Sequence, residues 1–258
     1  MNAVARRRTL PGARRLKDGS TLYWWAEILA ILVFYFVYSA VRNANKAGEI
    51  HAFHNAEHVI RWQQWLGIYH EETLQDWAQH FKPLIIAGNY FYGSLHFVVT
   101  IAAGIYLFRK FSDDYPRYRN TLAVATLLAL IGFKLFPLMP PRLLPGSYGF
   151  VDTLAQYPTF WSFNSGAVSK ISNQYAAMPS VHVCWSTWCA LVFAPRVKHR
   201  WAKVLAIAYP FFTVIVIVIT GNHYLLDAVG GLVVLALGWV IAGIFTRAGR
   251  GAPVAVAT

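Results

Sequence analysis

Residues 204–245 carry the sequence VLAIAYPFFTVIVIVITGNHYLLDAVGGLVVLALGWVIAGIF, in which a short polar break separates two apolar runs. A helix needs roughly 20 mostly apolar residues to cross the hydrocarbon layer of a bilayer. The runs 204–220 and 223–245 come close to that length or exceed it, and Asp227 is their one Asp, Glu, Lys or Arg. We therefore predict that each run forms a membrane-spanning helix.

Four further stretches are long and apolar enough to be predicted as spans: residues 22–41, 89–108, 121–138 and 179–195. The composition agrees, because 57% of the 258 residues are hydrophobic and only 13% are charged, whereas a soluble domain carries about 25% charged residues. The sequence predicts an all-α fold, a polytopic membrane bundle of six transmembrane helices within residues 21–246. A basic head (1–20) and a flexible tail (247–258) flank this domain. The first run lacks a small-residue cleavage site, so we expect an uncleaved anchor.

The connection 46–81 mixes tryptophans with acidic residues and is predicted as one or two amphipathic helices outside the bundle. Such helices lie in the membrane interface, and we favour passive packing there over a role in substrate gating. A metal site is another alternative, because four potential ligands follow near-helical spacing: His51, His54, Glu57 and His58. Nothing else marks them as catalytic, so we expect no metal and no cofactor.

Lysine and arginine accumulate in the cytoplasmic loops of membrane proteins. If the N-terminus is cytoplasmic, sixteen of the 23 lie on that side, in the head, the tail and the connections 109–119 and 195–203. The connections on the other side hold only six. We expect a multi-pass cell-membrane protein with both termini in the cytoplasm. The net charge of +12 then reflects orientation rather than nucleic-acid binding, and the expected partner is the lipid bilayer.

His223 and Asp227 stand at the start of the last run, and their spacing of four places them on one face of a helix. The carboxylate can fix the tautomer of the imidazole and leave its other nitrogen basic, as for a nucleophile with an orienting acid. The alternative is a structural hydrogen bond near the interface. An ionisable residue in a span costs about 2.5–3.5 kcal/mol and is a functional candidate, but Asp227 lies only one turn inside.

Pro179 and Ser180 are typical of helix starts, so the N–H groups that follow are predicted to form an anion site at the outer face. His182 lies in that first turn and could protonate a leaving oxygen; taken alone, it is better explained as a solvated interfacial histidine. Together with His223 it completes what phosphoryl transfer needs: one histidine to attack, one to protonate, and donors for the phosphate oxygens. Ser180 is therefore a predicted phosphate-binding residue.

Arg142 follows two prolines at the outer end of the third run, and its planar guanidinium suits phosphate. An interface-anchoring role is the alternative that we favour less. Lys134 lies about two turns earlier and must either snorkel or meet an anionic partner. We leave both roles open for it.

The three clusters resemble the motifs of the type 2 phosphatidic acid phosphatase superfamily in order, spacing and sidedness. These are six-span, metal-independent enzymes that act through a phosphohistidine. The inositol phosphorylceramide synthase-like branch looks most similar, because its members carry Pro-Pro-Arg, as at Arg142, and His-Tyr-x-x-Asp before Gly-Gly, as at His223. The stretch from Asn55 to Glu72 and the sequence Asn89-Tyr-Phe-Tyr-x-x-x-His96-Phe also look similar.

This resemblance implies His223 as the nucleophile, Asp227 as its orienting carboxylate, His182 as the general acid and base, and Arg142 as a phosphate ligand. The chain departs from the phosphatases in two places. Seven residues rather than six separate Lys134 from Arg142, and apolar residues at 216 and 217 replace Ser-Arg. One phosphate-binding cation is therefore missing, and we expect Asn222 to supply a neutral donor instead.

We expect an enzyme that cleaves or transfers a lipid-linked phosphate at the outer membrane surface. Water as the acceptor makes it a phosphatase, and an alcohol headgroup makes it a phosphotransferase, for example of phosphoinositol. The alternative is a non-catalytic transporter or lipid-binding protein. A transporter often shows paired polar breaks at the bilayer midplane, whereas the polar residues here collect at one face.

Overall fold

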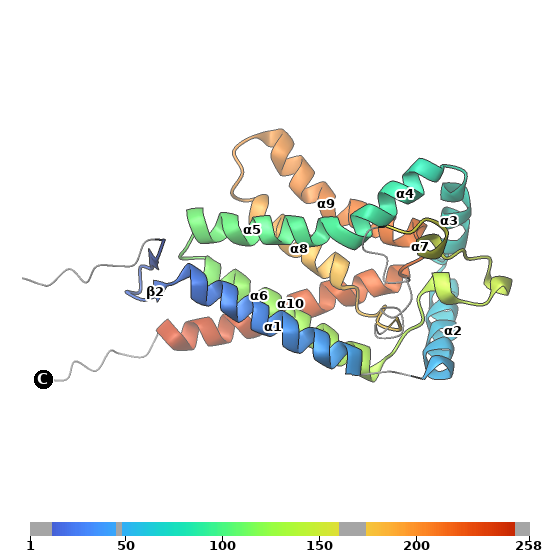
Figure 1. Ribbon diagram of the computed structural model, residues 1–258, viewed down its shortest axis with the longest axis horizontal. Coiled ribbons are helices and arrows are strands. Elements are labelled where there is room, and N and C mark those ends of the chain that lie inside the picture. The colour runs from blue at the N-terminus through green and yellow to red at the C-terminus, as the bar shows by residue number, and fades with distance from the viewer. Residues whose placement is uncertain (1–11, 45–47, 160–173, 251–258) are drawn as a thin grey trace, which may run out of the picture.

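The computed structural model describes residues 12–44, 48–159 and 174–250. Parts of the predicted head, tail and external connections lie outside the described residues, including Lys46 and Lys170. The described chain is a bundle of helices with further helices across one end (Figure 1).

The helices of the bundle are α1 (Trp24–Ala44), α5 (His96–Lys110), α6 (Tyr115–Leu135), α8 (Val181–Phe193), α9 (Arg200–Ile219) and α10 (Leu225–Arg250). The helices at the end of the bundle are α2 (Glu49–Trp65), α3 (Glu71–Gln79), α4 (Lys82–Tyr90) and α7 (Thr153–Gln156). Three single turns complete them: the π-helical η1 (Phe91–Leu95) between α4 and α5, and the 3-10 turns η2 (Pro141–Leu143) and η3 (Gly146–Tyr148). β1 (Arg14–Arg15), in the predicted head, pairs antiparallel with β2 (Thr21–Leu22), which follows the head.

Four helical stretches in the described part of the chain are long and apolar enough to cross a membrane: Trp24–Val41, Lys82–Lys110, Arg200–Ile219 and Leu225–Phe245. They overlap the predicted runs 22–41, 89–108, 204–220 and 223–245. The prediction of a helical, membrane-type bundle is therefore confirmed. The α10 helix continues to Arg250 and so includes the first residues of the predicted tail.

The other two predicted runs, 121–138 and 179–195, form α6 and α8. Neither helix is both long and apolar enough to be counted with these four stretches. The 13 residues of α8 make a helix of about 19 Å, shorter than the roughly 30 Å of a hydrocarbon core. Although α6 has 21 residues, it carries Arg117, Arg119 and Lys134 along its length. Six complete crossings therefore remain a prediction.

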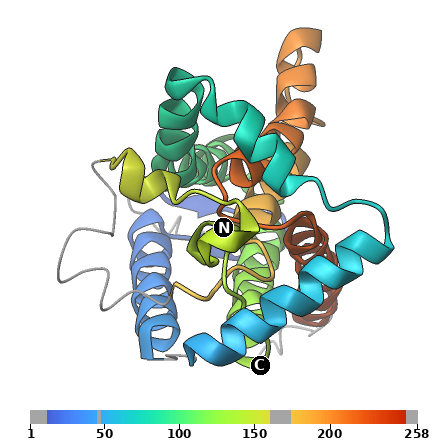
Figure 2. The same ribbon diagram turned by 90° about the vertical axis from the view of Figure 1, so that its right-hand side faces the viewer.

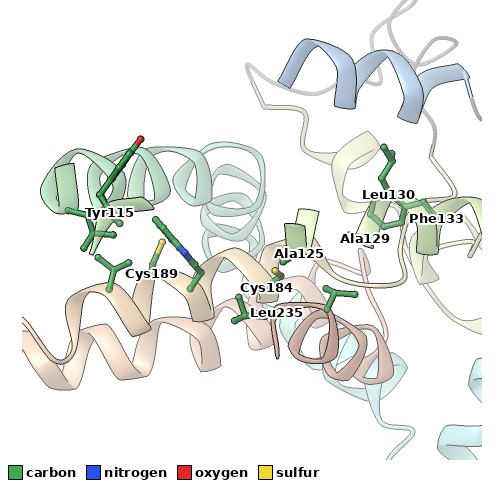
Figure 3. Packing of buried hydrophobic residues seen from close by; sticks show 13 residues of the cluster. Tyr115, Ala125, Ala129, Leu130, Phe133, Cys184, Cys189 and Leu235 are labelled. Atoms are coloured by element: carbon green, nitrogen blue, oxygen red, sulfur yellow. The ribbon is translucent and has the colours of Figure 1, made fainter. Parts of the chain in front are cut away.

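The main core lies where α6, α8 and α10 meet, as Figure 3 shows. Small buried side chains are frequent there, among them Ala125, Ala129, Cys184 and Cys189. Helices gain little from the hydrophobic effect between themselves in lipid and associate through close packing, which small residues allow. This packing fixes α8 against α10; His182 lies in the first turn of α8 and His223 lies two residues before α10.

Charged pairs gather at the end of the bundle where α1 and α6 begin and α10 ends (Figure 1). Glu27 of α1 forms an ion pair with Arg119 of α6 at 2.5 Å and accepts a hydrogen bond from the Tyr115 hydroxyl at 3.2 Å. Arg196 pairs with Asp114 at 2.6 Å. The one acidic residue of the first predicted span is thus neutralised within the protein.

At the opposite end, α2 lies across the bundle, as the end-on view of Figure 2 shows. Its inner face buries Ala52, Ala56 and Val59 in a second core that also contains residues on either side of Arg142 and His223. Its other face exposes Trp62 and Trp65. The amphipathic helices predicted for 46–81 are therefore present, and they pack directly on the elements that carry the predicted site.

Candidate active site

The nucleophile candidate precedes α10 directly and is fixed by that helix. The Asp227 carboxylate Oδ2 lies 3.1 Å from His223 Nδ1 and accepts the Tyr224 backbone N–H at 2.9 Å. A side chain in the first turn that accepts the N–H just before the helix is the backward half of a capping box. The i, i+4 pair predicted from the sequence is thus formed, and Asp227 is fully buried.

This contact determines which nitrogen of His223 is available. Because an ionised carboxylate can only accept, Nδ1 carries the hydrogen and Nε2 keeps its lone pair. His223 is 3% exposed, and its Nε2 has no hydrogen-bond partner among the described residues. A buried polar atom without a partner is costly in a folded protein and needs an explanation. An incoming electrophile would provide one.

The second histidine comes from the first turn of α8. Ser180 caps this helix by accepting the Val183 N–H at 3.4 Å, and its own N–H donates to the Asp227 carbonyl at 2.9 Å. The rings of His182 and His223 lie with their centroids 5.5 Å apart at 63°. The structure therefore brings the two predicted histidines together, and it shows Ser180 as the helix cap that links them.

A glycine makes this approach between α8 and α10 feasible. A Cβ added to Gly231 would collide with the Ser180 carbonyl oxygen and come within 3.3 Å of the Cys184 nitrogen. Both neighbours are backbone atoms, which cannot rotate away. Gly231, the second of the two glycines that follow the histidine motif, is thus required by the packing of α8 against α10.

Arg142 lies in η2 and is held from three directions. Its backbone N–H donates to the Gly221 carbonyl at 2.8 Å, its Nε to Asn222 Oδ1 at 3.1 Å, and its Nη1 to Asp152 Oδ2 at 3.0 Å. Its Nη2 makes no hydrogen bond within the described residues, so one arm of the guanidinium fork remains open. The amide of Asn222 also donates to Thr220 Oγ1 at 2.8 Å.

A family model of the PAP2 superfamily matches residues 57–241, well over half of the chain. The chain belongs to the PAP2 superfamily. The match runs from α2 to α10 and so includes both histidines and Arg142. Comparison with curated proteins and with solved structures found no match.

Lys134 is the predicted site residue that this PAP2 chain does not bring into the network. It lies near the end of α6, is exposed, and forms no ion pair or hydrogen bond among the described residues. Its predicted part in phosphate binding remains a prediction.

Two ring-bearing residues beside the histidines were not predicted as site residues. The Tyr92 ring stacks on His182 at 4.2 Å and 22°, and the His96 ring lies 4.4 Å from it. His96 follows the π-helical turn η1 and is buried; such turns are frequent at functional sites. A histidine within an apolar run was the signal available in the sequence.

Asp152 was missed as well, because it lies in an external connection with no motif around it. Its Oδ2 accepts Arg142, while its Oδ1 accepts the N–H groups of Leu154 and Ala155 at the start of α7. Gln75 of α3 holds the preceding residue, because its amide donates to the Val151 carbonyl at 3.1 Å and accepts the Val151 N–H at 2.9 Å.

Two histidines of α2 contact side chains of their own helix rather than the site. His54 Nδ1 lies 3.1 Å from Glu57, and Arg61 lies 2.9 Å from His58 Nδ1. The hydrogen bond from His54 lowers the pKa of Glu57 below its ordinary value. No group of three or more His, Cys, Asp or Glu side chains in the described segments is arranged to hold a metal ion.

Proposed function

We propose that this PAP2 protein is a metal-independent lipid phosphatase or phosphotransferase that works through a phosphohistidine on His223. One observation carries the proposal. The Asp227 carboxylate holds His223 Nδ1, while the buried Nε2 has no partner among the described residues and the His182 ring lies beside it. An oriented nucleophile with a second titratable group next to it is the arrangement that covalent catalysis requires.

In the first step, the Nε2 lone pair attacks the phosphorus of a lipid phosphate. The bond between phosphorus and the lipid oxygen breaks, and His182 gives a proton to that oxygen as the lipid alcohol leaves. The positive charge on the His223 ring is stabilised by Asp227. The open arm of Arg142 would donate to an oxygen of the transferred group.

In the second step, water or an alcohol attacks the phosphohistidine. His182, now neutral, takes the proton of the incoming hydroxyl, the phosphorus–nitrogen bond breaks, and its electron pair returns to Nε2. Water gives a phosphatase and an alcohol gives a phosphotransferase. Both steps use the same histidine as acid and then as base, which returns the site to its starting state.

The charge of the site favours a singly charged lipid as the donor. Arg142 is the one cation hydrogen-bonded into this network among the described residues, and Asp152 offsets its charge. A phosphomonoester approaches two negative charges at neutral pH, whereas a phosphodiester carries one. We therefore favour a phosphodiester lipid as the donor, in line with the inositol phosphorylceramide synthase-like branch and phosphoinositol transfer.

We further propose that the site lies on the extracytoplasmic side of the cell membrane, in a six-span arrangement with both termini in the cytoplasm. The strand β1 (Arg14–Arg15) pairs with β2, which lies at the end of the bundle opposite α2 and α3 (Figure 1), and the Lys17 N–H donates to Asp113 just before α6. A lipid in the outer leaflet would then reach His223 from the membrane, and the acceptor would enter from outside.

The deciding experiment follows release of diacylglycerol from phosphatidylinositol and from phosphatidic acid in detergent micelles. Diacylglycerol is the alcohol that leaves in the first step from either lipid. We expect His223→Ala to abolish release, while His51→Ala, an exposed histidine of α2, retains the wild-type rate. Chelators are expected to leave the rate unchanged. Wild-type rates in His223→Ala, or no release from either lipid by the wild type, would contradict the proposal.

A further inference from the structure

Two side chains from outside the bundle hold the first turn of α10. Leu225 donates its backbone N–H to Glu71 Oε1 at 2.8 Å, and Leu226 donates to Gln63 Oε1 at 2.9 Å. The two acceptors are joined to each other, since Gln63 Nε2 donates to Glu71 Oε1 at 2.6 Å. Both side chains are fully buried.

This arrangement replaces an ordinary helix cap. The first N–H groups of a helix have no partner within it and are normally satisfied by a Ser, Thr, Asp or Asn just before the helix. Tyr224 occupies that position here, but its hydroxyl donates to the Met139 carbonyl at 3.1 Å. The first two N–H groups of α10 therefore depend on α2 and α3.

Glu71 is an unusual group to bury for structure alone. It forms no ion pair with a described cation; its oxygens accept the N–H groups of Leu225, Gln63 and, at 3.1 Å, His70. Burial, with a contribution from Glu71, raises the pKa of neighbouring Tyr69 to about 12. Hydrogen bonds of this kind and the positive end of a helix stabilise a buried carboxylate.

We propose that Gln63 and Glu71 are positioning residues for the nucleophile: they set where α10 begins and thereby where His223 lies relative to His182. His223 stands two residues before Leu225, and Asp227 two residues after it, so a shift of this turn moves both members of the pair. A displacement of about 1 Å can cost on the order of 100-fold in rate. The inference rests on the proposed function of His223.

The test separates the rate of the first step from the number of working sites. The full-length protein is mixed rapidly with phosphatidylinositol or phosphatidic acid, and diacylglycerol release is followed before the steady state. The amplitude of the initial burst counts competent sites, and its rate constant reports attack by His223. The variants are Glu71→Gln and Gln63→Met, which keep the size of each side chain, with Asp76→Asn on the exposed face of α3 as the matched control.

We expect each variant to lower the burst rate constant at least about tenfold, with an amplitude near that of the wild type. In the double variant, the fall in the rate constant should be smaller than the product of the two single falls. Asp76→Asn should match the wild type. A reduced amplitude with an unchanged rate constant, a wild-type burst, or failure of both variants to fold would show a purely structural cap and overturn the inference. If the wild type releases no diacylglycerol, or if His223→Ala releases it at the wild-type rate, the proposed function has failed instead.

Discussion

Asp227 connects the two histidines through three separate contacts. Its carboxylate takes His223 Nδ1 and the Tyr224 N–H, and its backbone carbonyl takes the N–H of Ser180, two residues before His182. A single residue in the first turn of α10 thus orients one histidine and ties the start of α8, which carries the other, to the same turn. Both carboxylate hydrogen bonds go to Oδ2, while the buried Oδ1 has no hydrogen-bond partner among the described residues.

We therefore expect Asp227→Asn to fold but to lose most of its activity. An amide can turn its NH₂ group toward Nδ1, which would place the hydrogen on Nε2 and remove the attacking lone pair. By comparison with carboxylate-to-amide changes in other catalytic triads, kcat should fall roughly 10²- to 10⁴-fold. Diacylglycerol release under steady-state conditions measures the loss. Asp113→Asn, at the far end of the bundle, is the control, and a kcat within threefold of wild type would refute the expected role.

Hydropathy predicted the long helices of this chain well because apolar length is a local property. The runs 204–220 and 223–245 differ from α9 and α10 by only a few residues at most ends. The prediction was weaker for 179–195, because Ser180 caps the helix and α8 is left with 13 residues. The pair His223 and Asp227 could be predicted for the same reason as the helices, since both residues share one turn.

The remaining contacts of the site could not be predicted, because they join residues far apart in the sequence. Glu71 and Leu225 are separated by 154 positions, and Arg142 and Asn222 by 80. No periodicity connects such positions. The placement of α2 and α3 on the site, where their side chains contact α10 and the Val151 segment, was therefore missed. The expectation of passive packing for these helices remains a prediction.

The contact of α3 with that segment leads to a prediction about substrate binding. Gln75 holds Val151, and the next residue, Asp152, holds Arg142. We expect Gln75→Leu to loosen Arg142 and raise KM for the lipid roughly three- to tenfold with little change in kcat, since His223 keeps its own partners. Steady-state kinetics separate the two constants. Gln64→Leu on the exposed face of α2 should show no effect, and an unchanged KM in Gln75→Leu would contradict this account.

Seen as a whole, the molecule has two chemically different ends. One holds the paired charges of Glu27, Arg119, Arg196 and Asp114 together with the last turns of α10. The other holds the histidines and Arg142, covered by α2 and α3 (Figures 1 and 2). The orientation of these two ends relative to the membrane is the part of the proposal that labelling can test.

The proposed orientation can be tested with a membrane-impermeant maleimide, because both native cysteines are buried and should give little background. Ser147→Cys introduces a thiol at an exposed position in η3, near the site, and Lys198→Cys introduces one at an exposed position between α8 and α9. We expect Ser147→Cys to be labelled on intact cells and Lys198→Cys only after permeabilisation. The opposite pattern would place the site in the cytoplasm.

The loose attachment of α1 has an evolutionary consequence. Within the described stretch Trp24–Val41 no residue is buried, and the helix lies outside the matched family region, which begins at residue 57. Glu27 of this helix pairs with Arg119 and accepts a hydrogen bond from Tyr115. Selection on its sequence should therefore be weak apart from overall apolarity, while the acid and the arginine should be inherited or lost together, as a covarying pair within an otherwise drifting helix.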